Sequence, residues 1–345
     1  MRRRRWHPAA GVIERTLGAI PPASGAVVMG TGILSIALSL DDHETLSRIL
    51  LVLDALTWIA LTVLLPARAT RDRERFLTDV RGPAALTSVA GSAVLGTRFA
   101  LLHWDWAAIA LLVIAVVLWA ALVVPVLTHW RTPTVGVSLV LTVSTESLAV
   151  LAATLAPREH AQWLLLAALA PLGLGLAFYV FVIFRFDLHQ LEVGRGDHWV
   201  TGGALAISTL AAARITIGAK SFAVLGNGGG ALKGAALVLW VLTMLWLPVL
   251  LIAEALHPRP SYDVRRWSTV FPVGMYAACS FVVGLADHAG AITSFARPWV
   301  WVALAVWAPV FAAMIHRAVQ VVRGEQRPAS PGGLNELAPS QHKTV

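Results

Sequence analysis

The sequence predicts an all-α integral membrane protein: ten transmembrane helices form five helical hairpins, with the odd helices forming an inner ring around a central pore. Three observations support this class. Hydrophobic residues make up 57% of the 345 residues and charged residues only 13%, whereas a soluble domain carries about 25% charged residues. Ten apolar stretches are long enough to cross a bilayer. Small and hydroxylated residues concentrate in alternate stretches.

The ten spans follow from length and hydropathy, because a helix needs about 20 mainly apolar residues to cross the hydrocarbon core. The predicted spans are 21–40, 47–66, 83–102, 106–128, 134–156, 162–184, 199–218, 234–256, 267–286 and 298–316. They form one transport domain over 20–318. We expect 1–19 to be a basic cytoplasmic segment and 319–345 to be a disordered cytoplasmic tail, because the tail is polar and contains Pro and Gly.

The distribution of basic residues orients the spans. Of the 27 Lys and Arg residues, 20 lie in the segments on the side of the N-terminus, 5 lie in the loops on the other side and 2 lie within spans. Cytoplasmic loops of membrane proteins carry the excess of Lys and Arg. The sequence therefore predicts a multi-pass protein of the cell inner membrane with both termini in the cytoplasm.

The composition of the spans alternates along the chain. The five odd spans contain 33 Gly, Ser and Thr residues and the five even spans contain 8, whereas Trp numbers 2 in the odd spans and 9 in the even spans. Bulky apolar residues suit lipid contact, and small or hydroxylated residues suit close helix packing and water-lined paths. The alternation predicts odd helices inside and even helices outside. Helix packing alone, without a path, would explain the small residues of any single span equally well.

Glu146 is predicted near the middle of the fifth span. An ionisable group at the centre of a spanning helix costs about 2.5–3.5 kcal/mol on insertion scales, so it calls for a reason. The carboxyl could couple transport to protons, contact the substrate, or serve only as a structural group bonded to Ser144, Thr145 or another helix. A charged carboxylate would repel anions, so in an anion path we expect Glu146 to be protonated or turned away.

Two arginines fall within odd spans. Arg98 and Arg214 are both predicted about one turn below the outer surface, where two cations could form a funnel that concentrates anions. Snorkelling of each side chain to the headgroups is the alternative. Asp54, on an even span, could be the counter-ion of one of them.

Several further residues of the odd spans are candidates for the pore. Gly30 and Gly32 allow close backbone approach and Thr31 offers a hydroxyl donor. Phe271 followed by Pro272 suits a gate, because proline kinks the helix beside a large ring; a packed aromatic at a structural kink is the alternative. The residues predicted to line the substrate path are Gly30, Thr31, Gly32, Ser92, Glu146, Ser208 and Thr209.

The sequence offers no signature of an enzyme. It contains neither a His-Glu-x-x-His nor a Gly-x-Ser-x-Gly nor a Walker sequence. The histidines lack metal-ligand spacing, and the single cysteine, Cys279, excludes an internal disulfide. We therefore expect no cofactor, no metal and no enzymatic activity. The net charge of +8 is explained by membrane orientation, so nucleic acid is not an expected partner.

Four stretches resemble a known family. They are VVMGTGILSIAL (27–38), STESLAVLAA (144–153), GGALAISTLAAA (202–213) and WSTVFPVGMYA (267–277). The chain from about residue 20 to 318 resembles the tellurite-resistance/C4-dicarboxylate transporter family, which includes yeast malate permease, a sulfite efflux pump and the slow anion channels of plant guard cells. The resemblance implies five hairpins around a pore, a possible homotrimer, and a pore-plugging phenylalanine at the position of Phe271.

Two transport functions follow from these observations. The first is a transporter for small anions, either a C4-dicarboxylate such as malate or an oxyanion such as sulfite or tellurite, with protons coupled through Glu146. The second is a passive channel for chloride or nitrate, gated by Phe271. A membrane-embedded receptor or enzyme would need a soluble domain or a polar catalytic cluster, which this sequence does not provide.

Overall fold

The computed structural model describes residues 17–18, 20–193, 196–222, 228–258 and 262–324. The predicted segment 1–19 and the predicted tail therefore lie mostly outside the described residues. Residues 319–323, predicted as part of the tail, instead continue the last helix. The described chain is helical apart from turns, loops and one isolated β-bridge between Thr134 and Phe186.

Ten helical segments of the described chain are long and apolar enough to cross a membrane. The inner helices are α2 (Gly25–Leu40), α5 (Thr87–Leu101), α7 (Val140–Leu155), α11 (Val200–Phe222) and α13 (Trp267–Asp287). The outer helices are α3 (Glu44–Arg71), α6 (Asp105–Thr128), the pair α8 (Gln162–Ala167) and α9 (Leu169–Ile183), α12 (Gly228–Leu256) and α14 (Gly290–Arg323). The predicted fold class, an all-α membrane protein with ten spans, is confirmed.

Every hairpin has the same three parts: a short 3-10 turn, an inner helix and an outer helix. The 3-10 turns are η1 (Pro22–Ser24), η2 (Pro83–Leu86), η3 (Gly136–Leu139), η4 (Asp197–Trp199) and η5 (Val264–Arg266). Four of the reversals between inner and outer helix contain a non-glycine residue with positive φ: Asp42, His103, His160 and His288. The five hairpins are therefore repeats of one structural unit, as the alternating composition predicts.

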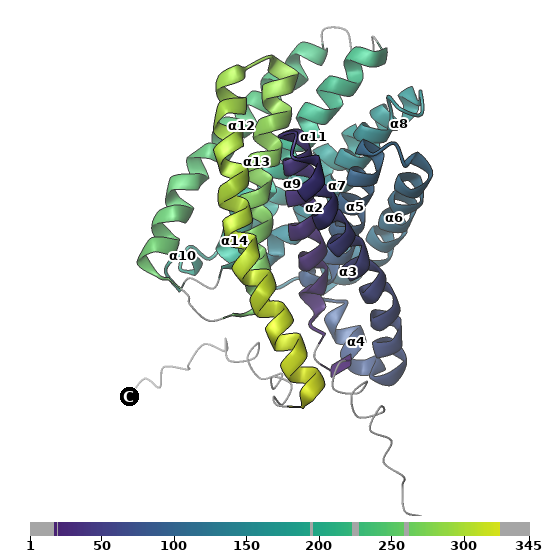
Figure 1. Ribbon diagram of the computed structural model, residues 1–345, viewed down its shortest axis with the longest axis vertical. Helices are drawn as coiled ribbons and strands as arrows, with labels where there is room; N and C mark the ends of the chain where they lie inside the picture. The colour runs from purple at the N-terminus through teal and green to yellow at the C-terminus, as the bar shows by residue number, and fades with distance from the viewer. Residues whose placement is uncertain (1–16, 19, 194–195, 223–227, 259–261, 325–345) are drawn as a thin grey trace, which may run out of the picture.

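Besides shifts of several boundaries, the structure differs from the predicted spans in three places. The loop after α3 contains a short helix, α4 (Arg73–Asp79). The sixth span is divided at Ala168, because Pro171 has no N–H to donate to the carbonyl of Ala167. The tenth span is longer than predicted, and α14 extends past the rest of the bundle on the side where α4 lies (Figure 1).

The inner and outer helices differ sharply in burial. Between 72% and 94% of the most apolar window of each inner span is buried, against 17–28% for each outer span. Adjacent inner helices pack against one another in chain order, and α13 packs against α2, so the ring closes. Figure 1 shows the outer helices α3, α6, α12 and α14 at the periphery of the bundle. The predicted arrangement of odd spans inside and even spans outside is confirmed.

Candidate functional site

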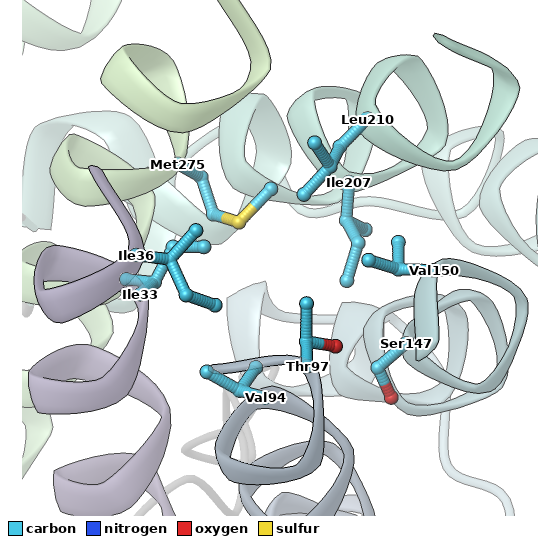
Figure 2. A pocket seen from close by; sticks show the side chains of 9 residues that line it. All are labelled: Ile33, Ile36, Val94, Thr97, Ser147, Val150, Ile207, Leu210 and Met275. Carbon is cyan, nitrogen blue, oxygen red and sulfur yellow. The ribbon is translucent and has the colours of Figure 1, made fainter. Parts of the chain in front are cut away.

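A small cavity lies on the axis of the inner ring, and all five inner helices contribute to its wall. Figure 2 shows the lining side chains converging on a common centre. The lining residues are Ile33 and Ile36 of α2, Val94 and Thr97 of α5, Ser147 and Val150 of α7, Ile207 and Leu210 of α11, and Met275 of α13. A cavity with contributions from every member of a closed ring lies where a solute could cross between these helices without meeting lipid.

The lining residues repeat with helical spacing. On each of α2, α5, α7 and α11 they lie three residues apart, so they form two successive layers along the axis. The layer nearer the N-terminal ends of the inner helices contains Ile33, Val94, Ser147 and Ile207. The layer nearer their C-terminal ends contains Ile36, Thr97, Val150 and Leu210. Branched apolar side chains predominate in both layers.

The cavity wall is apolar even where its residues carry hydroxyls. Thr97 Oγ1 donates to the carbonyl of Ala93 (2.8 Å), and Ser147 Oγ donates to the carbonyl of Ser144 (2.8 Å). Both hydroxyl protons are thus used within their own helices. The free space is about the size of one water molecule. An anion with its hydration shell cannot pass this point in the conformation described.

Phe271 lies one turn before Met275 on α13. Residues four apart share one face of a helix, so Phe271 is on the same face of α13 as Met275. The ring is buried. Because η5 precedes α13, Phe271 lies seven residues after the start of the span at Val264, about one turn deeper than the predicted boundary at 267 places it. The role of Phe271 as a gate stays a prediction.

Pro272 lies beside Phe271 but faces another direction. An added Cβ on Gly203 of α11 would lie 2.8 Å from Pro272 Cγ, so the proline ring packs directly on that glycine. This contact holds α13 close to α11 at the level of the Phe271 ring. Pro272 therefore supports the position of the proposed gate and is not itself on the cavity wall.

Hydroxyls of the inner ring accept hydrogen bonds from tryptophans of the outer ring. Four such bonds, which we call the tryptophan links, each join one hairpin to the next. The donors and acceptors are Trp58 to Ser92 (2.9 Å), Trp119 to Thr145 (2.9 Å), Trp240 to Ser280 (2.9 Å) and Trp307 to Thr31 (3.1 Å). The last of these closes the cycle from the fifth hairpin to the first. The alternation of hydroxyls and tryptophans along the sequence thus has a direct structural cause.

The predicted path residues are engaged by other helices. Thr31 and Ser92 are engaged by the tryptophan links. Thr209 Oγ1 lies 3.3 Å from Thr243 Oγ1 of the outer helix α12. Gly30 packs on the side chains of Trp267 and Val270 of α13, and Gly32 packs on Asp54 of α3. None of the predicted path residues lines the cavity among the described residues, so their contact with a passing anion stays a prediction.

Glu146 occupies the interface between the third and fourth hairpins. Its Oε2 accepts a hydrogen bond from Ser208 Oγ of α11 (2.7 Å), and its Oε1 has no hydrogen-bond partner among the described residues. The side chain packs on Gly175 of α9. Its neighbour Ser147 lines the cavity, whereas Glu146 lies behind it. The carboxyl is therefore bonded to another helix, one of the alternatives expected from the sequence, and its part in transport stays a prediction.

Glu146 also completes the cycle of links. The tryptophan links join the first hairpin to the second, the second to the third, the fourth to the fifth and the fifth to the first. Within the described residues, no tryptophan of α8 or α9 bonds to α11, and the bond between Glu146 and Ser208 joins the third hairpin to the fourth at this position. Trp246 Nε1 of α12 also donates to the Tyr179 hydroxyl of α9 (3.2 Å) across the same pair of hairpins. Glu146 thus engages the inner-helix hydroxyl that an outer tryptophan engages at the other four interfaces.

The two buried arginines do not form the predicted pair. Arg98 is buried between α5 and α3; its Nη2 donates to Glu44 Oε2 (2.7 Å) and its Nε to Ser47 Oγ (3.1 Å). Because Glu44 compensates the charge of Arg98, the predicted anion funnel formed by Arg98 and Arg214 together is wrong. The predicted counter-ion is also wrong. Asp54 is buried with both oxygens unpartnered among the described residues, and Glu44 pairs with Arg98 in its place.

Arg214 fits the prediction better. It lies four residues after Leu210 and seven after Ile207 on α11, hence on the same helical face as these two lining residues. It is half-buried, and no ion pair of the described residues includes it. It lies eight residues before the end of α11, about 12 Å along the helix. This is deeper than the predicted single turn, because α11 continues beyond residue 218.

Sequence reasoning missed the cavity wall itself. Ile33, Val94 and Ile207 look like any apolar residue of a membrane helix. What these residues share is a spacing: on four helices, two lining positions lie three residues apart. This spacing can be recognised only when the inward face of each helix is known. Among the described residues, no three His, Cys, Asp or Glu side chains come together as metal ligands.

Comparison with known proteins agrees with this architecture. The model of the voltage-dependent anion channel family matches residues 19–315, nearly the whole described chain. An uncharacterized membrane protein from two strains of Mycobacterium tuberculosis is 35% identical over 148 residues, which is 41% of this chain and 75% of that protein. The resemblance inferred from the four sequence stretches is thereby confirmed, and the chain belongs to the voltage-dependent anion channel family.

Proposed function

We propose that this protein conducts small anions along the axis of the inner ring. The observation that carries the proposal is the axial cavity, to which every inner helix contributes. Membership of an anion channel family supports a negatively charged solute. Arg214, on the same face of α11 as the lining residues Ile207 and Leu210, adds a cation to one approach. On the charge bias of the loops, we place both termini in the cytoplasm.

The closed axis has two barriers in series. The first is the double layer of apolar side chains around the cavity, which excludes hydrated ions because no wall group replaces their water. The second is the ring of Phe271, one turn away on α13. Rotation of that side chain to another staggered rotamer would open this level of the axis without moving the backbone.

Passive conduction is the mechanism that the cavity wall supports best, because none of its lining residues is titratable. Chloride and nitrate are the substrates of this mechanism. Proton-coupled transport is the second candidate, favoured by Glu146 directly behind the wall, whose Oε1 has no hydrogen-bond partner in the part of the chain that the structure describes. Its substrates would be C4-dicarboxylates such as malate, or sulfite and tellurite, as the family resemblance implies.

The test is to replace Phe271 with alanine and measure anion currents in planar bilayers and flux into proteoliposomes. If the ring is a barrier of only about 1.4 kcal/mol, its removal raises conductance about ten-fold. Phe281→Ala is the matched control, because Phe281 is also buried on α13 but lies ten residues away, roughly 80° around the helix from Phe271. Equal effects of the two substitutions would refute the gate. Absence of anion flux in every form would refute conduction.

A further inference from the structure

Arg214 occupies the next layer of the axis beyond the apolar constriction. On four inner helices the residue seven positions after the first lining residue returns to the same face. These positions are Leu40, Leu101, Thr154 and Arg214. Arg214 is therefore the single charged residue among these four, and it faces the axis at the end where the inner helices terminate.

The other basic side chains near this end are occupied. Arg98 pairs with Glu44, Arg158 with Asp105, Lys233 with Asp287 and Arg297 with Asp41, and Lys220 donates to the carbonyl of Ala286. Arg214 has no such acidic partner within the described chain. Arg214 thus differs from these other cations, each of which has an acceptor or an acidic partner within the described chain.

The unpaired donors of Arg214 have a specific geometry. Its Nε and Nη2 are buried and have no acceptor among the described residues. These two N–H groups lie parallel along one edge of the guanidinium plane. That edge matches two oxygens of a single carboxylate or similar oxyanion. A buried charged donor without an acceptor is costly, so a bound anion would remove a penalty as well as add two hydrogen bonds.

We propose that Arg214 binds one small oxyanion bidentately, through Nε and Nη2, immediately before the constriction. The ligand class is an anion that presents two oxygens about as far apart as those of a carboxylate: nitrate, a carboxylate or a sulfite-type ion. A halide is a single acceptor atom, so it cannot lie in line with both of the parallel N–H bonds. This inference rests on the proposed anion path and names the chemistry that the path selects.

The test measures binding separately from flux. Purified protein in detergent is unfolded thermally at constant ionic strength with increasing nitrate or chloride, because a ligand bound to the native state raises the Tm. Wild type should show a saturable nitrate effect stronger than that of chloride. Arg214→Gln should weaken nitrate binding about ten-fold or more, since hydrogen bonds to charged groups are lost. Arg214→Lys should retain a charge-dependent response but lose the preference for nitrate.

Lys220→Gln is the matched control, because it removes one positive charge from the exposed end of the same helix. Equal nitrate binding in wild type and Arg214→Gln, or equal loss in Arg214→Gln and Lys220→Gln, would overturn the site. Flux assays on the same preparations separate the two proposals. Normal flux and binding in Arg214→Gln leave conduction standing and remove the site, whereas saturable nitrate binding without flux in wild type removes conduction and retains the site.

Discussion

Substitution of Gly175 by alanine tests the placement of Glu146 against α9. A Cβ at this position would lie 2.2 Å from Glu146 Cγ and 2.7 Å from its Cδ, so the glutamate side chain must move. Overpacking of this kind costs about 1–3 kcal/mol, and loss of the bond to Ser208 adds about 0.5–1.5 kcal/mol. Alanine gains up to about 1 kcal/mol in helix propensity. We expect Gly175→Ala to lower the free energy of unfolding by roughly 2 kcal/mol.

Gly173 provides the matched control on the same helix. An added Cβ there meets no atom within 4 Å, so Gly173→Ala should leave stability unchanged or raise it slightly. The assay is denaturant unfolding in detergent followed by the fluorescence of the 14 tryptophans. In a Glu146→Ala background the clashing atoms are gone, so Gly175→Ala should cost nothing there. The same cost in both backgrounds, or equal costs at Gly173 and Gly175, would refute the contact.

Two further predictions concern the links and the coupling. Trp58→Phe should destabilise the protein by about 1 kcal/mol, because it removes the hydrogen bond to Ser92. Thermal unfolding measures the effect, and Trp163→Phe at an exposed site is the control that should leave the Tm unchanged. Equal shifts in Tm for the two variants would contradict the link. If transport is proton-coupled through Glu146, Glu146→Gln should flatten the pH dependence of flux into vesicles. An unchanged pH profile would remove Glu146 from the coupling.

The ring architecture could be predicted because it depends on average composition. Lipid contact selects bulky apolar residues over a whole helix and helix contact selects small ones, so about 20 residues contribute to each assignment. Errors at single residues do not alter such an average. The structure therefore confirms the inner and outer sets even though several boundaries shift, most of all at α14.

The directions of individual side chains could not be predicted from the same information. A hydroxyl on an inner helix can face the axis, its own backbone or an outer helix, and the choice depends on distant residues. Thr31 is engaged by Trp307, 276 residues later, and Arg98 by Glu44, 54 residues earlier. Neither partner is marked by local spacing. The predicted path residues share a helix set with the cavity wall but face elsewhere.

The cycle of links between hairpins has a mechanical consequence for opening. To widen the axis by moving one inner helix outward, the protein must lengthen or break a bond to a neighbouring hairpin, either a tryptophan link or the contact between Glu146 and Ser208. Turning the side chains of Phe271 and Met275 breaks none of these bonds. Rotation of side chains on an unchanged backbone, in the two apolar layers as well as at Phe271, is therefore the kind of opening motion that would leave the links intact.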